Sequence, residues 1–123
     1  MTLSPNRITL APGQALTFNG IAQGFATDII TAELAAAGFT HALINIGEYR
    51  ALGGPWHIGI DDPAAGQIAQ LALTGQAVAT SSPAALMVGG QPHILSRDGA
   101  APHWSTVSIT APTAAMADAL STG

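Results

Sequence analysis

The sequence predicts an α+β fold, in which a mainly antiparallel sheet carries two helices on one of its faces. Frequent Gly (14) and Pro (8) divide the 123 residues into short segments, and this punctuation is typical of strands joined by tight turns. One longer stretch has helical spacing of its apolar residues, and the alanine-rich carboxyl end favours a second helix. A chain of this length can bury one core, so we expect one domain spanning residues 1–123.

The composition excludes several classes of partner and chemistry. Arg7, Arg50 and Arg97 are the whole basic complement, and with seven carboxylates they give a net charge of -4. A basic patch for nucleic acid or for an anionic membrane surface cannot be built from so few cations. Because cysteine is absent, disulfides and a cysteine nucleophile are excluded, and any metal must be held by oxygen or imidazole.

A helix is predicted at about residues 20–37, after an entering hairpin that residues 7–10 and 15–18 form around a Pro12-Gly13 turn. Apolar side chains recur along this helix with helical spacing, at Ile21, Phe25, Ile29 and Leu34. We expect this apolar stripe to face the core. Asn19 is a suitable N-cap, and Gly38 can adopt the left-handed conformation that ends a helix.

Strands are predicted wherever a short apolar run is bounded by turn residues. They lie at residues 41–46, 56–60, 67–73, 77–80 and 105–110, with turns at 61–63 and 89–90. The strand at 41–46 follows the helix directly, so the two form one αβ unit. A last helix begins near Thr113, because Pro112 suits a first helical turn and alanine favours the helical state.

This last helix carries a candidate cation site. Asp118 and Thr122 are four residues apart, so a helix places the carboxylate and the hydroxyl on one face within a single turn. Mg²⁺ accepts a few protein oxygens and leaves its other positions for water and phosphate. The same spacing also fits an ordinary solvated helix face, so both interpretations stay open at this point.

Three further segments are candidates for a ligand site. The turn at residues 19–25 would offer backbone N–H groups to an anion at a helix start, or be a helix cap with close packing at Gly24. His93 precedes a polar loop and would project into a cleft, or serve as a half-buried structural residue. The hydroxyls of residues 80–82 would bind a ligand, or cap a short helix expected at 83–88.

Five segments of the chain form an ordered set. They are NGIAQGFATD (19–28), ALINIGEYRALG (42–53), PWHIGIDDP (55–63), AVATS (77–81) and VSITAPTAAMADALST (107–122). In this order they resemble successive blocks of the ApbE family, the FAD:protein FMN transferases. The resemblance covers nearly all of the chain from about Leu16 onward, and the fixed order makes it specific although each block alone is weak.

The resemblance implies a magnesium-dependent reaction that cleaves FAD at its pyrophosphate, joins FMN to a threonine hydroxyl of a target protein and releases AMP. Asp118 and Thr122 match the family's metal ligands at the same offset, and Ala22 matches the residue that supplies a backbone carbonyl. His93 matches a motif histidine that lies against the flavin and is linked to catalysis. Weaker matches for lining the flavin site are Glu48, Ser81 and Ile94.

The resemblance also raises expectations about completeness and setting. Family members carry a longer segment before the block at 19–28 and continue beyond the last helix, so we expect this chain to be the C-terminal portion of such a domain. Residues 96–100 depart from the family motif that follows His93, and a non-catalytic flavin-binding or partner-binding remnant is therefore the alternative. A homo-oligomer or a complementing second chain would complete the site. Relatives usually work in the periplasm or anchored outside the cytoplasm, whereas the start of this sequence shows no export signal.

Overall fold

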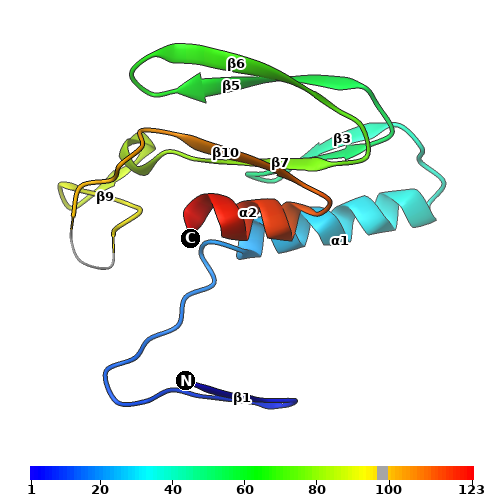
Figure 1. The fold of residues 1–123 in the computed structure, drawn as a ribbon. Helices are drawn as coiled ribbons and strands as arrows, with labels where there is room; N and C mark the ends of the chain where they lie inside the picture. Colours follow the sequence, from blue (N-terminus) through cyan, green and yellow to red (C-terminus); the bar gives the residue numbers. More distant parts are fainter. Residues whose placement is uncertain (97–99) are drawn as a thin grey trace.

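The computed structural model describes residues 1–96 and 100–123, and within them the fold has three layers (Figure 1). A four-stranded sheet forms the middle layer, two helices cover one of its faces, and a long hairpin covers the other. The prediction of an α+β fold with a mainly antiparallel sheet is confirmed.

The middle sheet has the strand order β10-β7-β4-β3, and every neighbouring pair is antiparallel. Its strands are β3 (Ala42–Asn45), β4 (Tyr49–Leu52), β7 (Ala77–Ser81) and β10 (Val107–Ala111). Strand β4 has no counterpart among the predicted strands, because its Tyr-Arg-Ala-Leu run neither alternates clearly nor forms a continuous apolar segment. Its pairing with β3 and β7 places it inside the sheet all the same.

The hairpin of β5 (Trp56–Asp62) and β6 (Gly66–Leu73) covers the second face of the sheet. The larger core lies between these two layers and is formed by Ala51, Ile58, Ile60, Leu73 and Val78. Along β5 buried and exposed residues alternate, as expected for a strand with one face on a core and the other in water.

The opposite face carries α1 (Ala22–Ala36) and α2 (Ala114–Thr122), which pack against each other and against the sheet. A smaller core made only of alanines from β7, β10 and α2 lies beneath α2. Short side chains let the helix and sheet backbones come close together. Gly38 ends α1 as predicted, with a φ of 92°, which a glycine adopts without steric cost.

The side of α1 that faces the core is not the predicted apolar stripe. Phe25 is 60% exposed and Ile29 is 46% exposed, whereas Gly24, Thr27 and Thr31 are buried. Both threonine hydroxyls donate to backbone carbonyls one turn earlier, at 2.8 and 2.7 Å, so they are satisfied inside the helix and need no further partner. Small, locally satisfied side chains make the contact, and the prediction that the apolar stripe faces the core is wrong.

Two predictions near the amino terminus also differ from the structure. The entering hairpin is formed by β1 (Thr2–Ser4) and β2 (Arg7–Thr9), which pair across a turn at Pro5-Asn6, whereas the turn at Pro12-Gly13 joins no paired strands among the described residues. Residues 15–18 form no strand. Asn19 does not cap α1, since Ile21 occupies the N-cap position and makes no side-chain cap bond.

The segment after β7 is less helical than predicted. The short helix expected at 83–88 is a single 3-10 turn, η1 (Pro83–Ala85), followed by the small hairpin of β8 (Met87–Val88) and β9 (Gln91–Pro92). The other predicted strands are confirmed with small shifts of their ends. In the part of the chain that the structure describes, no helix is both long and apolar enough to cross a membrane.

Candidate functional site

A cavity of about 1060 Å³ opens where the start of α1, the end of α2, the end of β7 and the β8–β9 hairpin meet. Six of the residues singled out in the sequence line it: Glu48, Ser81, His93, Ile94, Asp118 and Thr122. They come from four different segments, so the fold and not the chain order brings them together. The seventh, Ala22, is not among the described residues that line the cavity, although its neighbours Gly20 and Gln23 are.

Asp118 is held where the two helices touch. Its side chain is buried at 3% exposure, and Oδ2 accepts a hydrogen bond from the backbone N–H of Gly24 at 3.0 Å. A Cβ atom on residue 24 would lie only 2.4 Å from the carbonyl oxygen of Ala114, so only glycine permits this approach of the two helix backbones. Asp118 is therefore buried, and the interpretation of this helix face as solvated surface does not hold at that residue.

Thr122 is linked to the sheet through a chain of hydroxyls. The Oγ atom of Ser81, at the end of β7, lies 3.0 Å from Thr122 Oγ1 and 2.9 Å from Ser121 Oγ. Gly20 packs against the same threonine, since a Cβ there would lie 2.9 Å from Thr122 Cγ2. These contacts fix the last turn of α2 against both β7 and the segment that enters α1.

Glu48 places a second carboxylate in the cavity. Burial raises the pKa of Glu48 to about 7, the negative charge of Asp118 adds to the rise, and a backbone hydrogen bond from Thr80 opposes it. Gly47 beside it packs against the side chain of Gln23, because a Cβ at residue 47 would lie 2.7 Å from the Gln23 amide. Two acidic groups thus interact within one cavity without a lysine or arginine in its described lining.

His93 presents one nitrogen to the protein backbone. Its Nδ1 lies 3.2 Å from the carbonyl oxygen of Pro83 and 3.1 Å from that of Leu86. Carbonyl oxygens only accept, so the neutral ring carries its proton on Nδ1 and keeps a lone pair on Nε2. The histidine that lines the cavity can therefore accept a proton there.

Comparison with known proteins identifies the family of this chain. A model of the ApbE family matches residues 1–123. The chain belongs to the ApbE family. No curated protein sequence matches the chain, so the solved structures provide the detailed comparison.

Three solved structures show the same fold as this ApbE-family chain. The flavinyl transferase ApbE from Pseudomonas stutzeri, in its apo form, is 33% identical over 87% of the chain, with a TM-score of 0.68. The ApbE protein from Thermotoga maritima is 33% identical over 85%, with a TM-score of 0.73. The flavin transferase ApbE from Vibrio cholerae is 25% identical over 84%, with a TM-score of 0.65. The chain spans 37 to 38% of the length of these proteins.

The oxygen donors of the cavity fit a magnesium ion of the kind that the ApbE resemblance implies. Within residues 1–96 and 100–123, no three His, Cys, Asp or Glu side chains converge to form a complete metal cage. Mg²⁺ does not require one, because it binds through one or two carboxylates and keeps water and substrate phosphates as its other ligands. The paired acids, Asp118 and Glu48, have the charge that a divalent cation would neutralise.

Residues that position this site escaped the sequence analysis. Asp28 of α1 contacts α2, and Gln23 packs against the turn that bears Glu48, whereas the close packing at Gly24 was one of the two interpretations of the 19–25 turn. The available signal was a set of polar and small residues on one face of α1, beside the apolar stripe. Residues 97–99 of the stretch that departs from the family motif lie outside the described residues.

Proposed function

We propose that this chain provides the cation-binding and flavin-binding part of a magnesium-dependent FAD:protein FMN transferase. One observation carries the proposal: six residues chosen for this chemistry line a single cavity. Membership of the ApbE family and the likeness to flavin transferase structures support flavinyl transfer as the reaction class. FAD is the proposed donor and a threonine of a target protein the proposed acceptor.

The proposed reaction is a phosphoryl transfer. The threonine Oγ attacks the phosphorus of the FMN half of FAD, a new P–O bond forms, and the bond from that phosphorus to the bridging oxygen breaks. AMP leaves with the bridging oxygen, and the target protein keeps FMN through a phosphoester. Such reactions are catalysed mainly by positioning and by stabilising charge.

His93 is the proposed proton acceptor. With Nδ1–H bonded to backbone carbonyls, Nε2 keeps a lone pair that can take the proton that the threonine hydroxyl loses. Ser81 and Ile94 would contact the flavin half of the substrate, from a strand end and from the loop that follows β9. Because each comes from a different element, the bound nucleotide would bridge the end of β7 and the loop that follows β9.

Asp118, Thr122 and the backbone carbonyl of Ala22 are the proposed ligands of Mg²⁺, with Glu48 as a neighbouring carboxylate. The bound ion would neutralise charge on the diphosphate. The burial of Asp118 and its bond to Gly24 support this assignment, because a buried carboxylate with fixed geometry is preorganised for a cation.

Two assays on residues 1–123 test the proposal. FAD binding is measured by flavin fluorescence with and without Mg²⁺, and AMP release from FAD is measured by chromatography. Covalent flavin is then sought by in-gel fluorescence on an acceptor polypeptide and on its Thr→Val variant. Because the chain spans only part of the length of its relatives, we expect weak FAD binding that is strengthened by magnesium, and slow labelling that is lost in the Thr→Val variant. Binding that ignores magnesium would contradict the cation site, and binding without AMP release or labelling would favour the non-catalytic alternative.

Association with a second chain remains a prediction. The exposed apolar stripe of α1, with Phe25 and Ile29, is compatible with it. Light scattering on the purified chain measures the oligomeric state directly, and a monomer at all accessible concentrations would contradict self-association.

A further inference from the structure

We propose that Asp28 is a positioning residue of the cation site. It holds the first turn of α2 against α1, and in doing so places Asp118 and Thr122 at the cavity. The link to the cation rests on the proposed function. The link to the position of α2 rests on contacts in the structure alone.

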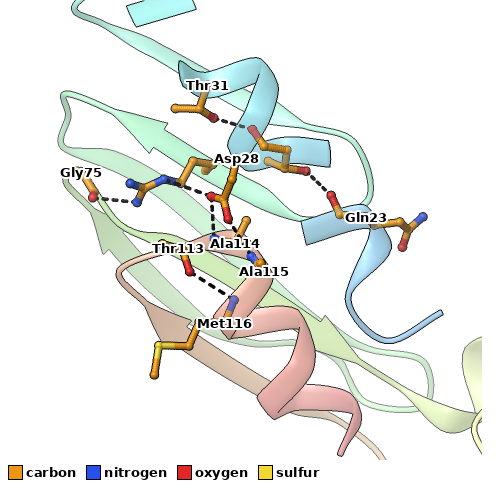
Figure 2. Close-up of polar contacts among 10 residues, drawn as sticks. Gln23, Asp28, Thr31, Gly75, Thr113, Ala114, Ala115 and Met116 are labelled. Atoms are coloured by element: carbon orange, nitrogen blue, oxygen red, sulfur yellow. Dashed lines mark hydrogen bonds and ion pairs between the residues drawn. The ribbon is translucent and has the colours of Figure 1, made fainter. Parts of the chain in front are cut away.

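Asp28 caps a helix to which it does not belong. Its Oδ1 accepts from the backbone N–H of Ala114 at 2.8 Å, and its Oδ2 accepts from that of Ala115 at 2.9 Å (Figure 2). The next N–H, of Met116, donates to the hydroxyl of the N-cap residue Thr113 at 3.2 Å. Two of the first-turn N–H groups of α2, which no helix can satisfy internally, are therefore satisfied by a carboxylate from α1.

Arg50 orients this carboxylate from the sheet. Its Nε lies 3.6 Å from Asp28 Oδ1, and its Nη1 donates to the carbonyl oxygen of Gly75 at 2.8 Å. The two charged side chains are 19% and 23% exposed, so solvent screens their attraction only in part. Through Arg50 the Asp28 carboxylate is tied to β4 and to the turn before β7, as well as to both helices.

Gly24 and Asp28 form two points of attachment along one face of α1. They are four residues apart and so lie one helical turn from each other. Asp28 holds Ala114 and Ala115, while the Gly24 N–H holds Asp118 one turn further along α2. Two attachments fix both the displacement and the rotation of one helix on another. A shift of the start of α2 would therefore move Asp118 and Thr122 away from Gly24 and Ser81.

A merely stabilising role is the competing explanation, and Thr113 provides the matched control. Thr113 satisfies an N–H of the same helix end, but its hydroxyl accepts from Met116 of α2, and no hydrogen bond joins that hydroxyl to α1 among the described residues. Removing it weakens the start of α2 without releasing α2 from α1. Asp28→Asn removes the charge and replaces one acceptor oxygen by an NH₂ group that cannot accept. Even where the two variants lose the same stability, Asp28→Asn should therefore disturb the cavity more than Thr113→Ala does.

The experiment compares the unchanged chain with Asp28→Asn and Thr113→Ala by two measurements, at a temperature where circular dichroism shows all three folded. Isothermal calorimetry measures the dissociation constant for Mn²⁺, used as the probe of the cation site. Amide hydrogen exchange by NMR measures the protection of the Gly24 N–H. That group lies in the first turn of α1, where it has no intrahelical acceptor, so its protection reports its bond to Asp118.

We expect Asp28→Asn to raise the Mn²⁺ dissociation constant about tenfold, the effect typical of losing a group that orients a metal ligand, and to abolish the protection of Gly24. Thr113→Ala should leave both close to those of the unchanged chain. Equal effects of the two variants, or unaltered protection in folded Asp28→Asn, overturn the proposal.

If the unchanged chain takes up no Mn²⁺, the proposed function fails, while Gly24 exchange still tests the role of Asp28. If Asp28→Asn does not fold, Asp28→Glu replaces it: one added methylene must displace α2, and unaltered Gly24 protection overturns the proposal.

Discussion

The backbone N–H of Gly24 donates a hydrogen bond to the carboxylate of Asp118 at 3.0 Å, across 94 positions of sequence. This bond joins the first turn of α1 to the residue on α2 that is the best candidate for a metal ligand. The glycine is needed for the contact, because its Cα faces the backbone of Ala114 with no room for a side chain. The geometry of the cavity therefore depends on how closely the two helices pack.

Gly24→Ala should destabilise the protein although alanine favours a helix. The added Cβ would lie 2.4 Å from the Ala114 carbonyl oxygen and 2.8 Å from the Ala115 Cα, both backbone atoms that cannot rotate away. Overpacking of this kind outweighs the gain in helix propensity, and we expect a net loss of about 2 kcal/mol in the free energy of unfolding. Urea denaturation measures it. Gly59→Ala is the control, since the three atoms nearest to its Cβ would all belong to the flexible side chain of Gln67; an equal loss in both would contradict the explanation.

Asp118→Asn should preserve the fold and weaken cation binding. Asparagine keeps the shape and can still accept from the Gly24 N–H, but the charge that attracts a divalent ion is lost. We expect the Mn²⁺ dissociation constant to rise at least about tenfold, as measured by calorimetry. Glu33→Gln, which removes one negative charge from the exposed surface of α1, should leave the affinity unaltered. A comparable loss in both variants would indicate a nonspecific effect of net charge.

Local composition was sufficient to place Asp118 and Thr122 on one helical turn and insufficient to predict what surrounds them. The four-residue spacing of Asp118 and Thr122 requires only a helix, which local composition predicts. The contacts of Asp28 with Ala114 and Ala115 depend on how two distant helices cross. No local pattern encodes that crossing.

The apolar stripe of α1 shows the limit of periodicity in another way. Spacing identifies a helix and its two faces, but which face is buried depends on what lies opposite. Here the partner is the alanine-rich α2, which requires small residues such as Gly24 at the contact. Burial therefore follows the size of the side chains, and Phe25 remains exposed.

Asp62→Asn should lower the stability of the hairpin side of the fold at neutral pH. The carboxylate accepts from the hydroxyl of Thr106 at 2.6 Å and from the N–H groups of Ala64 and Ala65 at 2.9 Å. Hydrogen bonds from Ser105 and Thr106 hold the pKa of Asp62 well below its ordinary value of 3.8. A depressed folded-state pKa gives stability that is present above 3.8 and is lost as pH falls.

The difference between Asp62→Asn and the unchanged protein should therefore be largest above pH 3.8 and shrink in more acidic solution. Urea midpoints across the acid range measure it. Asp61→Asn, the exposed neighbour on the same strand, should show a smaller effect. A difference between Asp62→Asn and the unchanged protein that does not vary with pH would mean that the charge of Asp62 is irrelevant.

Glu48 should make the protein less stable as pH rises, and a divalent cation should reverse this. Its pKa rises from 4.5 to about 7 in the folded state, through burial first and the charge of Asp118 second. Between these values the folded state holds more protons than the unfolded state, so the free energy of unfolding falls with increasing pH. Glu48→Gln has no charge to bury and should be the more stable protein above pH 7, with no such advantage below pH 4.5. Parallel pH profiles for the two proteins would contradict the raised pKa of Glu48.

Because Mg²⁺ would favour the ionised pair, it should raise the urea midpoint of the unchanged protein more at alkaline than at acid pH. A magnesium effect that is independent of pH would show that Glu48 and Asp118 do not share the cation site.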